Sequence, residues 1–188
     1  FPVSPNGRLS VFYAFESTDV TGVQGMRSDP PEDRASLLIF EDSDEGRVAT
    51  QSVGYSYSWD SRRAGLDTST AVVLRFGQEF GVGDADFIRS VASATAETRV
   101  FNDEITLRAS VEAGQLDYTD GDSRITDRFF LNSRRMRGFE AGGIGPRDAD
   151  TDDALGGNTF AVARLEAEFP LGLPEEYGIT GGVFFDYG

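Results

Sequence analysis

The sequence lacks histidine, cysteine and lysine altogether, so that all 17 of its cationic residues are arginine. Without cysteine there is no disulfide, no thiolate metal site and no cysteine nucleophile. Without histidine the commonest general base and the commonest metal ligand are missing. Since no nucleophile–base constellation stands out either, we expect no enzymatic activity, no cofactor and no metal.

Positive charge is also scarce, because 17 arginines face 32 acidic residues and leave a formal net charge of −15. Nucleic-acid binding requires clustered cations that neutralise phosphates, so this balance argues against it. No apolar run approaches the roughly 20 residues of a membrane-spanning helix. The 188 residues are enough for one domain with a sizeable core.

What the sequence has in abundance is alternation of apolar and polar residues with a period of two, which is typical of β-strands with two unlike faces. Residues 50–59, TQSVGYSYSW, are the cleanest example. We predict an all-β fold, an antiparallel up-and-down meander of about seven strands. The predicted strands are 9–16, 50–59, 70–80, 87–101, 105–116, 159–169 and 179–187.

The polar faces of several predicted strands carry arginine and glutamate together. These faces would be solvated in a soluble sandwich and would line a wet lumen in a membrane barrel, and periodicity does not separate the two. In a meander the two longest connections, 17–49 and 117–158, share one end, which favours an outer-membrane barrel. Aromatic residues near the strand ends would suit interfacial girdles: Phe80, Phe87, Phe101, Tyr118, Phe169 and Tyr177.

Three segments of the long connections raise separate expectations. A short helix after Pro30-Pro31, with an apolar patch at 37–39, would cap the rim of the barrel. The acidic stretches 117–127 and 148–157 resemble calcium loops. A calcium loop starting at Asp148 would need glycine and glutamate at positions 153 and 159. Asp153 and Thr159 stand there instead, so we interpret these stretches as solvated acidic loops.

The segment RRMRGFEAGGIGPRD, residues 134–148, is a long loop segment between good strand patterns. Strand periodicity places Glu166 and Asp186 on the polar face of neighbouring strands. Our hypothesis is that Arg137 folds inward and bridges these two acids, since a guanidinium fork satisfies two carboxylates at once. Gly138 would allow a sharp turn or a close approach to the wall, and Phe139 would anchor the loop by apolar contact. A mobile, exposed loop remains the alternative at this point.

These same residues carry a resemblance to the BamA family of outer-membrane protein assembly factors, in particular its alphaproteobacterial members. RMRGFEAGGIGPRD and DALGGNTFAVARLEAEFPLGLPEEYGITGGVFFDYG resemble the family's inward loop and the strands after it, and the likeness runs from about residue 48 to the end. Met136 departs from the family, which commonly has Val, Ile or Leu there. The positions that match the family's motifs are Arg137, Gly138, Phe139, Glu166, Phe184, Asp186 and Gly188.

The resemblance implies that residues 1–188 are part of a C-terminal transmembrane barrel of about sixteen strands, of which this sequence supplies the seventh to thirteenth. The POTRA repeats and the first and last barrel strands would then be absent. It also implies that the whole protein folds and inserts β-barrel proteins into the bacterial outer membrane. Its partners would be outer-membrane lipids, unfolded β-barrel clients and accessory assembly lipoproteins, and no nucleic acid.

Other functions stay open. A TamA-type assembly factor or a two-partner secretion transporter would share the Arg-Gly-Phe/Tyr loop. A soluble β-sandwich binding module with acidic loops would share the alternation. An acid-catalysed hydrolase would need two carboxylates within roughly 5–9.5 Å of each other in a pocket.

Overall fold

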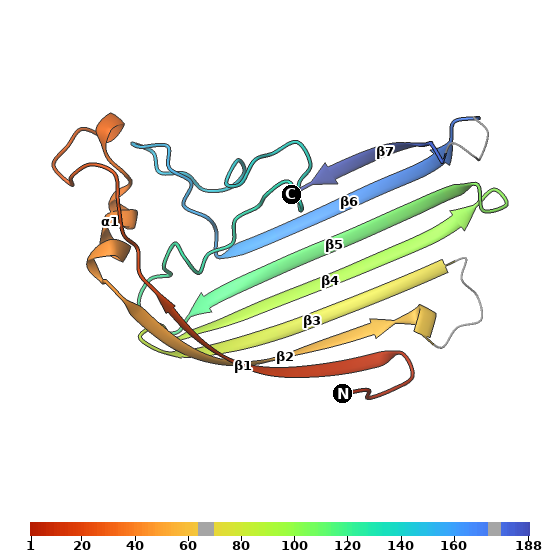
Figure 1. The fold of residues 1–188 in the computed structure, drawn as a ribbon, viewed down its shortest axis with the longest axis horizontal. Coiled ribbons are helices and arrows are strands. Elements are labelled where there is room, and N and C mark those ends of the chain that lie inside the picture. Colours follow the sequence, from red (N-terminus) through yellow and green to blue (C-terminus); the bar gives the residue numbers. More distant parts are fainter. Residues whose placement is uncertain (64–69, 173–177) are drawn as a thin grey trace.

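The computed structural model describes residues 1–63, 70–172 and 178–188, and in this part of the chain seven strands form one antiparallel sheet in chain order (Figure 1). The all-β meander is thereby confirmed. Its strands are β1 (Gly7–Thr18), β2 (Val48–Asp60), β3 (Thr70–Gly83), β4 (Phe87–Val100), β5 (Ile105–Tyr118), β6 (Thr159–Pro170) and β7 (Thr180–Tyr187).

The strand ends lie within a few residues of the positions that the alternation predicts. β1 starts two residues before residue 9, and β4 ends at Val100 rather than at Phe101, which lies in the turn that follows. The expected girdle residue Tyr177 lies outside the described residues, as do parts of the connections 60–69 and 170–178. Every strand pairs with its successor, so the two longest connections do emerge at the same end of the sheet.

The apolar face of the sheet is its exposed face. Val11, Val53, Val111, Leu165 and Phe185 each leave more than half of their surface accessible. The described residues contain no second sheet that could cover this face. An apolar surface of this extent marks a contact with another apolar phase or partner, and it is the reverse of a soluble sandwich, where the same face would form the core.

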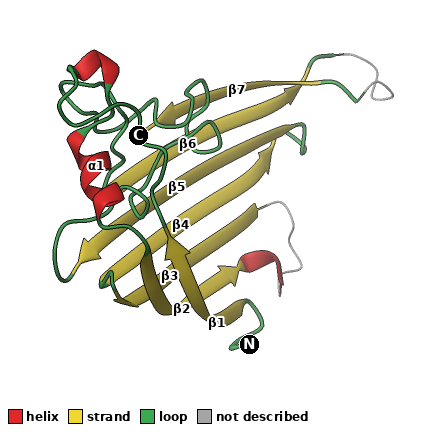
Figure 2. Cartoon of the chain, turned by 60° about the vertical axis from the view of Figure 1, so that its left-hand side comes forward, coloured by secondary structure: helices red, strands yellow, loops and turns green. Residues whose placement is uncertain are grey.

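The buried core lies on the opposite, polar face, where the two long connections fold over one end of the sheet (Figure 2). Phe129 lies between two small clusters of buried apolar residues and packs against both. The first cluster contains Val48, Ala85, Phe87 and Leu116, and the second contains Leu131, Met136, Phe160 and Val162. The fold therefore holds its loops inside the curve of the sheet rather than outside it.

The first long connection contains the expected helix. A 3-10 turn, η1 (Pro31–Asp33), precedes α1 (Leu37–Asp44), and a second 3-10 turn, η2 (Ser61–Arg63), follows β2. Ser36 caps α1, because its hydroxyl accepts a hydrogen bond from the amide of Leu38 at 3.3 Å. Among the described residues, no helix has the length and apolarity needed to cross a membrane.

Three phenylalanines on the polar face lie over a glycine directly opposite them on the neighbouring strand. A Cβ atom added to any of these glycines would come within 2.6 Å of the phenylalanine ring. Glycine is thus required at these positions by close approach, since the ring occupies the space of the missing side chain. The pairs are Phe12–Gly54, Phe87–Gly81 and Phe160–Gly114.

Replacing Gly114 with alanine should therefore destabilise the sheet. The new Cβ would meet Cε1 of Phe160 at 2.3 Å and Cζ of Phe129 at 3.0 Å, and would displace both rings from the core. We expect a loss of about 1–3 kcal/mol in the free energy of unfolding, measured by chemical denaturation of the complete protein. Gly182→Ala is the matched control, since its nearest neighbour is an ordinary 3.6 Å away. Equal midpoints for the two variants would contradict the prediction.

Candidate functional site

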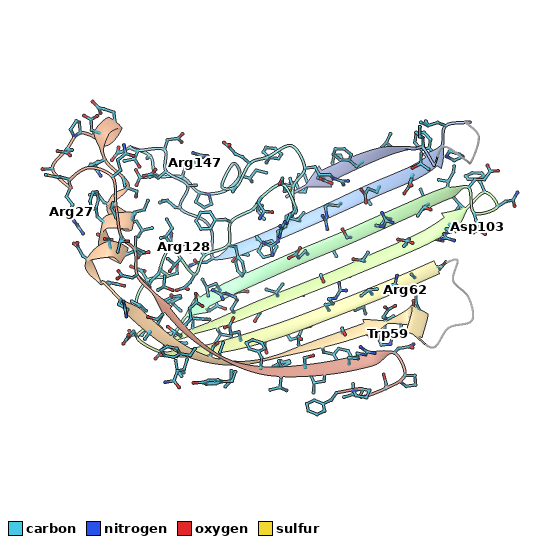
Figure 3. All side chains as sticks on the ribbon, viewed as in Figure 1. Arg27, Trp59, Arg62, Asp103, Arg128 and Arg147 are labelled. Carbon is cyan, nitrogen blue, oxygen red and sulfur yellow. The ribbon has the colours of Figure 1, made fainter. Side chains whose placement is uncertain are left out.

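The candidate site is the place where the connection 119–158 meets the polar face of β5, β6 and β7. Asn132 sets the turn there, because its carbonyl accepts the amides of Arg135 at 2.9 Å and Met136 at 2.8 Å. Arg128 and Arg147, labelled in Figure 3, bind carbonyl groups of the same connection and keep it compact. The turn directs the next side chains toward the sheet.

Arg137 lies between Asp186 and Glu166. Its backbone amide and its Nε both donate to Oδ2 of Asp186, at 3.0 and 2.8 Å, and its Nη2 donates to Oδ1 at 2.6 Å. Its Nη1 donates to Glu166. The guanidinium group also lies over the ring of Phe184, 3.9 Å from the centroid. We call this arrangement the Arg137 lock.

The pairing of β6 with β7 explains why the two acids share one guanidinium group. Glu166 is directly opposite Phe184, and Arg164 is directly opposite Asp186, so the two acids project from the same face two register positions apart. Two carboxylates placed so close repel each other unless a cation lies between them. A guanidinium fork fits this position because it is planar and donates in two directions.

Three further predicted residues have different surroundings. Gly138 has φ +87° and no atom within 4 Å of an added Cβ, so it is required for the turn and not for close approach to the wall. Phe139 is 44% exposed and belongs to neither buried cluster. The apolar anchor is Met136 instead, which is 4% exposed. An added Cβ at Gly188 would meet Sδ of Met136 at 3.0 Å.

Arg108 is a site residue that the sequence reasoning missed. Its Nε donates to Glu97 at 2.9 Å and its Nη1 donates to Glu166 at 3.3 Å, and register places it directly between these two acids. Five charges of alternating sign therefore cross the sheet from β4 to β7, and we call this row the charge ladder. In order they are Glu97, Arg108, Glu166, Arg137 and Asp186.

The ladder reinforces the protonated state of Arg137. Hydrogen bonds to Asp186, the largest effect, raise the pKa of Arg137 further above its ordinary value, against an opposing effect of burial and with a further contribution from Glu166. Arginine is a permanent cation in any case, so the lock does not open by deprotonation of Arg137.

The acidic stretch 148–157 is not simply solvated, as the sequence suggested. Ser36 donates its hydroxyl to Asp148 at 2.7 Å and its amide to Asp153 at 2.7 Å. The hydroxyl of Ser36 and the amides of Asp150 and Thr151 lower the pKa of Asp148 to about 2. These bonds tie the start of α1 to the second long connection. No group of three or more carboxylates in the described part of the chain is placed to hold a metal ion.

A family model described as the Omp85 superfamily domain matches residues 1–188, the whole sequence. The chain belongs to the Omp85 superfamily. Its open sheet with an apolar outer face and a loop docked on the inner face fits part of an Omp85 barrel.

Two relatives of this Omp85 chain are both described as outer membrane protein assembly factor BamA. The protein from Neorickettsia risticii is 42% identical over 118 residues, which cover 61% of this chain and 16% of the relative. The protein from Nitratidesulfovibrio vulgaris is 24% identical over 162 residues, covering 84% of this chain and 20% of the relative. The resemblance to the BamA family is confirmed, and the chain spans a fifth or less of these relatives' length.

Because Arg108 and Arg137 share Glu166, their contributions to stability should be coupled. We expect a coupling energy of about 0.5–3 kcal/mol between Arg108→Gln and Arg137→Gln in a double-mutant cycle. The measurement is the free energy of unfolding of the complete protein.

Arg99→Gln provides the control, since Arg99 lies on the same face two residues from Glu97. It makes no hydrogen bond or ion pair with any residue that the structure describes. The losses in free energy of unfolding should add when Arg99→Gln is combined with Arg137→Gln. If the losses of Arg108→Gln and Arg137→Gln also add, the ladder does not act as a unit.

The tie between α1 and Asp148 should weaken in acid. The pKa of Asp148 falls from its ordinary 3.8 to about 2 on folding, so its contribution is complete above about pH 4 and disappears as the pH falls through 2. Pepsin cleavage of residues 36–44 should be slower in the wild type than in Asp148→Ala at pH 4, and the two rates should converge near pH 2. A constant ratio of the two rates across this range would refute the assignment.

Proposed function

We propose that this chain is the part of an outer-membrane assembly factor's barrel that holds the inward loop, in a protein that folds and inserts β-barrel proteins into the bacterial outer membrane. The observation that carries the proposal is the Arg137 lock inside an Omp85 sheet. The relatives named BamA support the assembly function over other functions of this superfamily.

The two faces of the sheet have different roles. The exposed apolar face contacts the hydrocarbon of outer-membrane lipids, because a hydrocarbon phase removes the cost of its contact with water. The polar face, with its charge ladder and docked loop, keeps this wall rigid while other parts of the barrel receive client strands. Clients and accessory assembly lipoproteins are the proposed partners, and insertion proceeds through non-covalent contacts without catalytic chemistry.

The alternative functions fit the structure less well. A soluble sandwich would bury the apolar face that this sheet exposes. A hydrolase would need two free carboxylates, whereas Glu166 and Asp186 both accept hydrogen bonds from Arg137. A TamA-type factor or a two-partner secretion transporter would share the Arg-Gly-Phe/Tyr loop, but the 42% identical relative is described as BamA.

Replacing Arg137 with alanine should release the loop and impair client assembly. Asp186, only 5% exposed in its side chain, would lose its cation, and breaking such a pair costs about 3 kcal/mol. We expect the Arg137→Ala variant of the complete protein to melt at a lower temperature than the wild type. We also expect a β-barrel client to insert more slowly into vesicles that contain the variant than into vesicles that contain the wild type.

Arg134→Ala is the control, because the Arg134 side chain is exposed and makes no contact among the described residues that the lock uses. Wild-type heat stability together with wild-type insertion in the Arg137→Ala variant would overturn the proposal.

A further inference from the structure

A second arginine of the same turn, two residues before Arg137, reaches the inner face of the sheet, which we call the wall. Nε and Nη2 of Arg135 donate to Oε1 of Glu112, at 3.0 and 2.9 Å. The guanidinium group of Arg135 also lies over the ring of Phe160, 4.7 Å from its centroid. An arginine between a carboxylate and an aromatic face is thus repeated within three residues of the chain.

The two contacts use different parts of the wall. Glu112 is on β5, directly opposite Val162 of β6, whereas the lock uses Glu166 on β6 and Asp186 on β7. No hydrogen bond or ion pair joins the two sets among the described residues. Because the two contacts share no partner, the opening of one does not remove a group that the other needs.

The wall is already shaped for Arg135. Phe160 is 6% exposed, its ring fills the space above Gly114, and it packs edge-on against Phe129 with centroids 4.8 Å apart. Met136, between the two arginines, packs into the cluster that contains Phe160. The ring that receives the guanidinium group is therefore held in place by the core, and little order is lost when Arg135 docks.

The backbone of the turn supports the same placement. Nη1 of Arg164, from β6, donates to the carbonyl of Arg134 at 2.9 Å. Side chains and backbone of 134–137 are thus held from three strands of the sheet.

We propose that Arg135, Glu112 and Phe160 form a second clamp that holds the loop on the wall independently of the Arg137 lock. When one clamp opens, the other keeps the loop close to its site, so the open clamp re-forms at high effective concentration. Full release of the loop requires both clamps to open. The second clamp is inferred from the contacts of Arg135 with Glu112 and Phe160. Its consequence for client assembly rests on the proposed function.

The test changes only the wall, so that the loop sequence and its trypsin sites stay the same. Glu112→Gln opens the second clamp, Asp186→Asn opens the lock, and the third variant combines them, each in the complete protein in vesicles. Glu168→Gln is the matched control, because Glu168 is an acid of the same face that accepts a bond from Thr180 and none from the loop. The readout is the rate of trypsin cleavage after Arg134, which requires local opening of the turn.

We expect each single substitution to raise the cleavage rate about tenfold and the double about a hundredfold, because independent contacts multiply in the opening equilibrium. A Glu112→Gln rate equal to that of Glu168→Gln overturns the proposal. So does a double variant that is cleaved no faster than Asp186→Asn.

Should Asp186→Asn fail to form a heat-stable barrel, Glu166→Gln, which removes the other acid of the lock and also leaves the loop sequence unchanged, takes its place in the comparison. Client insertion is measured on the same samples. Faster cleavage with unchanged insertion supports the clamp and contradicts the proposed role of the docked loop in assembly.

Discussion

The charged residues on the inner face of the sheet have to be paired with charges on the same side, because the outer face is apolar. The loop docks on the sheet because of this constraint. The register places Glu166 and Asp186 close together on neighbouring strands, with Arg108 available to only one of them. Arg164, directly opposite Asp186, directs its hydrogen bonds to Ser110 and to the carbonyl of Arg134 instead, and the outer face is apolar. The cation that joins the two acids comes from Arg137, and its guanidinium group helps to fix the turn of the connection on the sheet.

Apolar contacts and charges act together at this place rather than in separate layers. Met136 is buried between two arginines, each of which lies over a phenylalanine ring of the wall. The ring of Phe160, under Arg135, is itself held by its close approach to Gly114 and by the core, so this guanidinium group meets a surface that is already ordered. This arrangement keeps the inner side firm while the outer side remains free to contact lipid.

The period of two in the sequence is enough to predict the seven strands and the shared face of Glu166 and Asp186, and the assumption of an up-and-down meander adds the strand order. Register is not contained in that pattern, because it depends on turn geometry and on all strands together. Arg108 and Glu97, or Arg135 and Glu112, could therefore not be paired from the sequence. The sequence also does not predict which side chains of the loop point toward the sheet. Phe139 was expected to anchor the loop, but the turn at Asn132 buries Met136 instead.

Ser36 and Asp148 are 112 residues apart in the chain and yet share a hydrogen bond, and the amide of Ile125 donates to Asp42 of α1 at 2.6 Å. The sequences of the connections at the end of a barrel usually diverge faster in evolution than the sequences of its strands. These two are not free to diverge separately, since a change at Ser36 removes the hydroxyl donor of Asp148 in the other connection. Substitutions in one should be accompanied by substitutions in the other, and their evolutionary history should be read as that of a single surface.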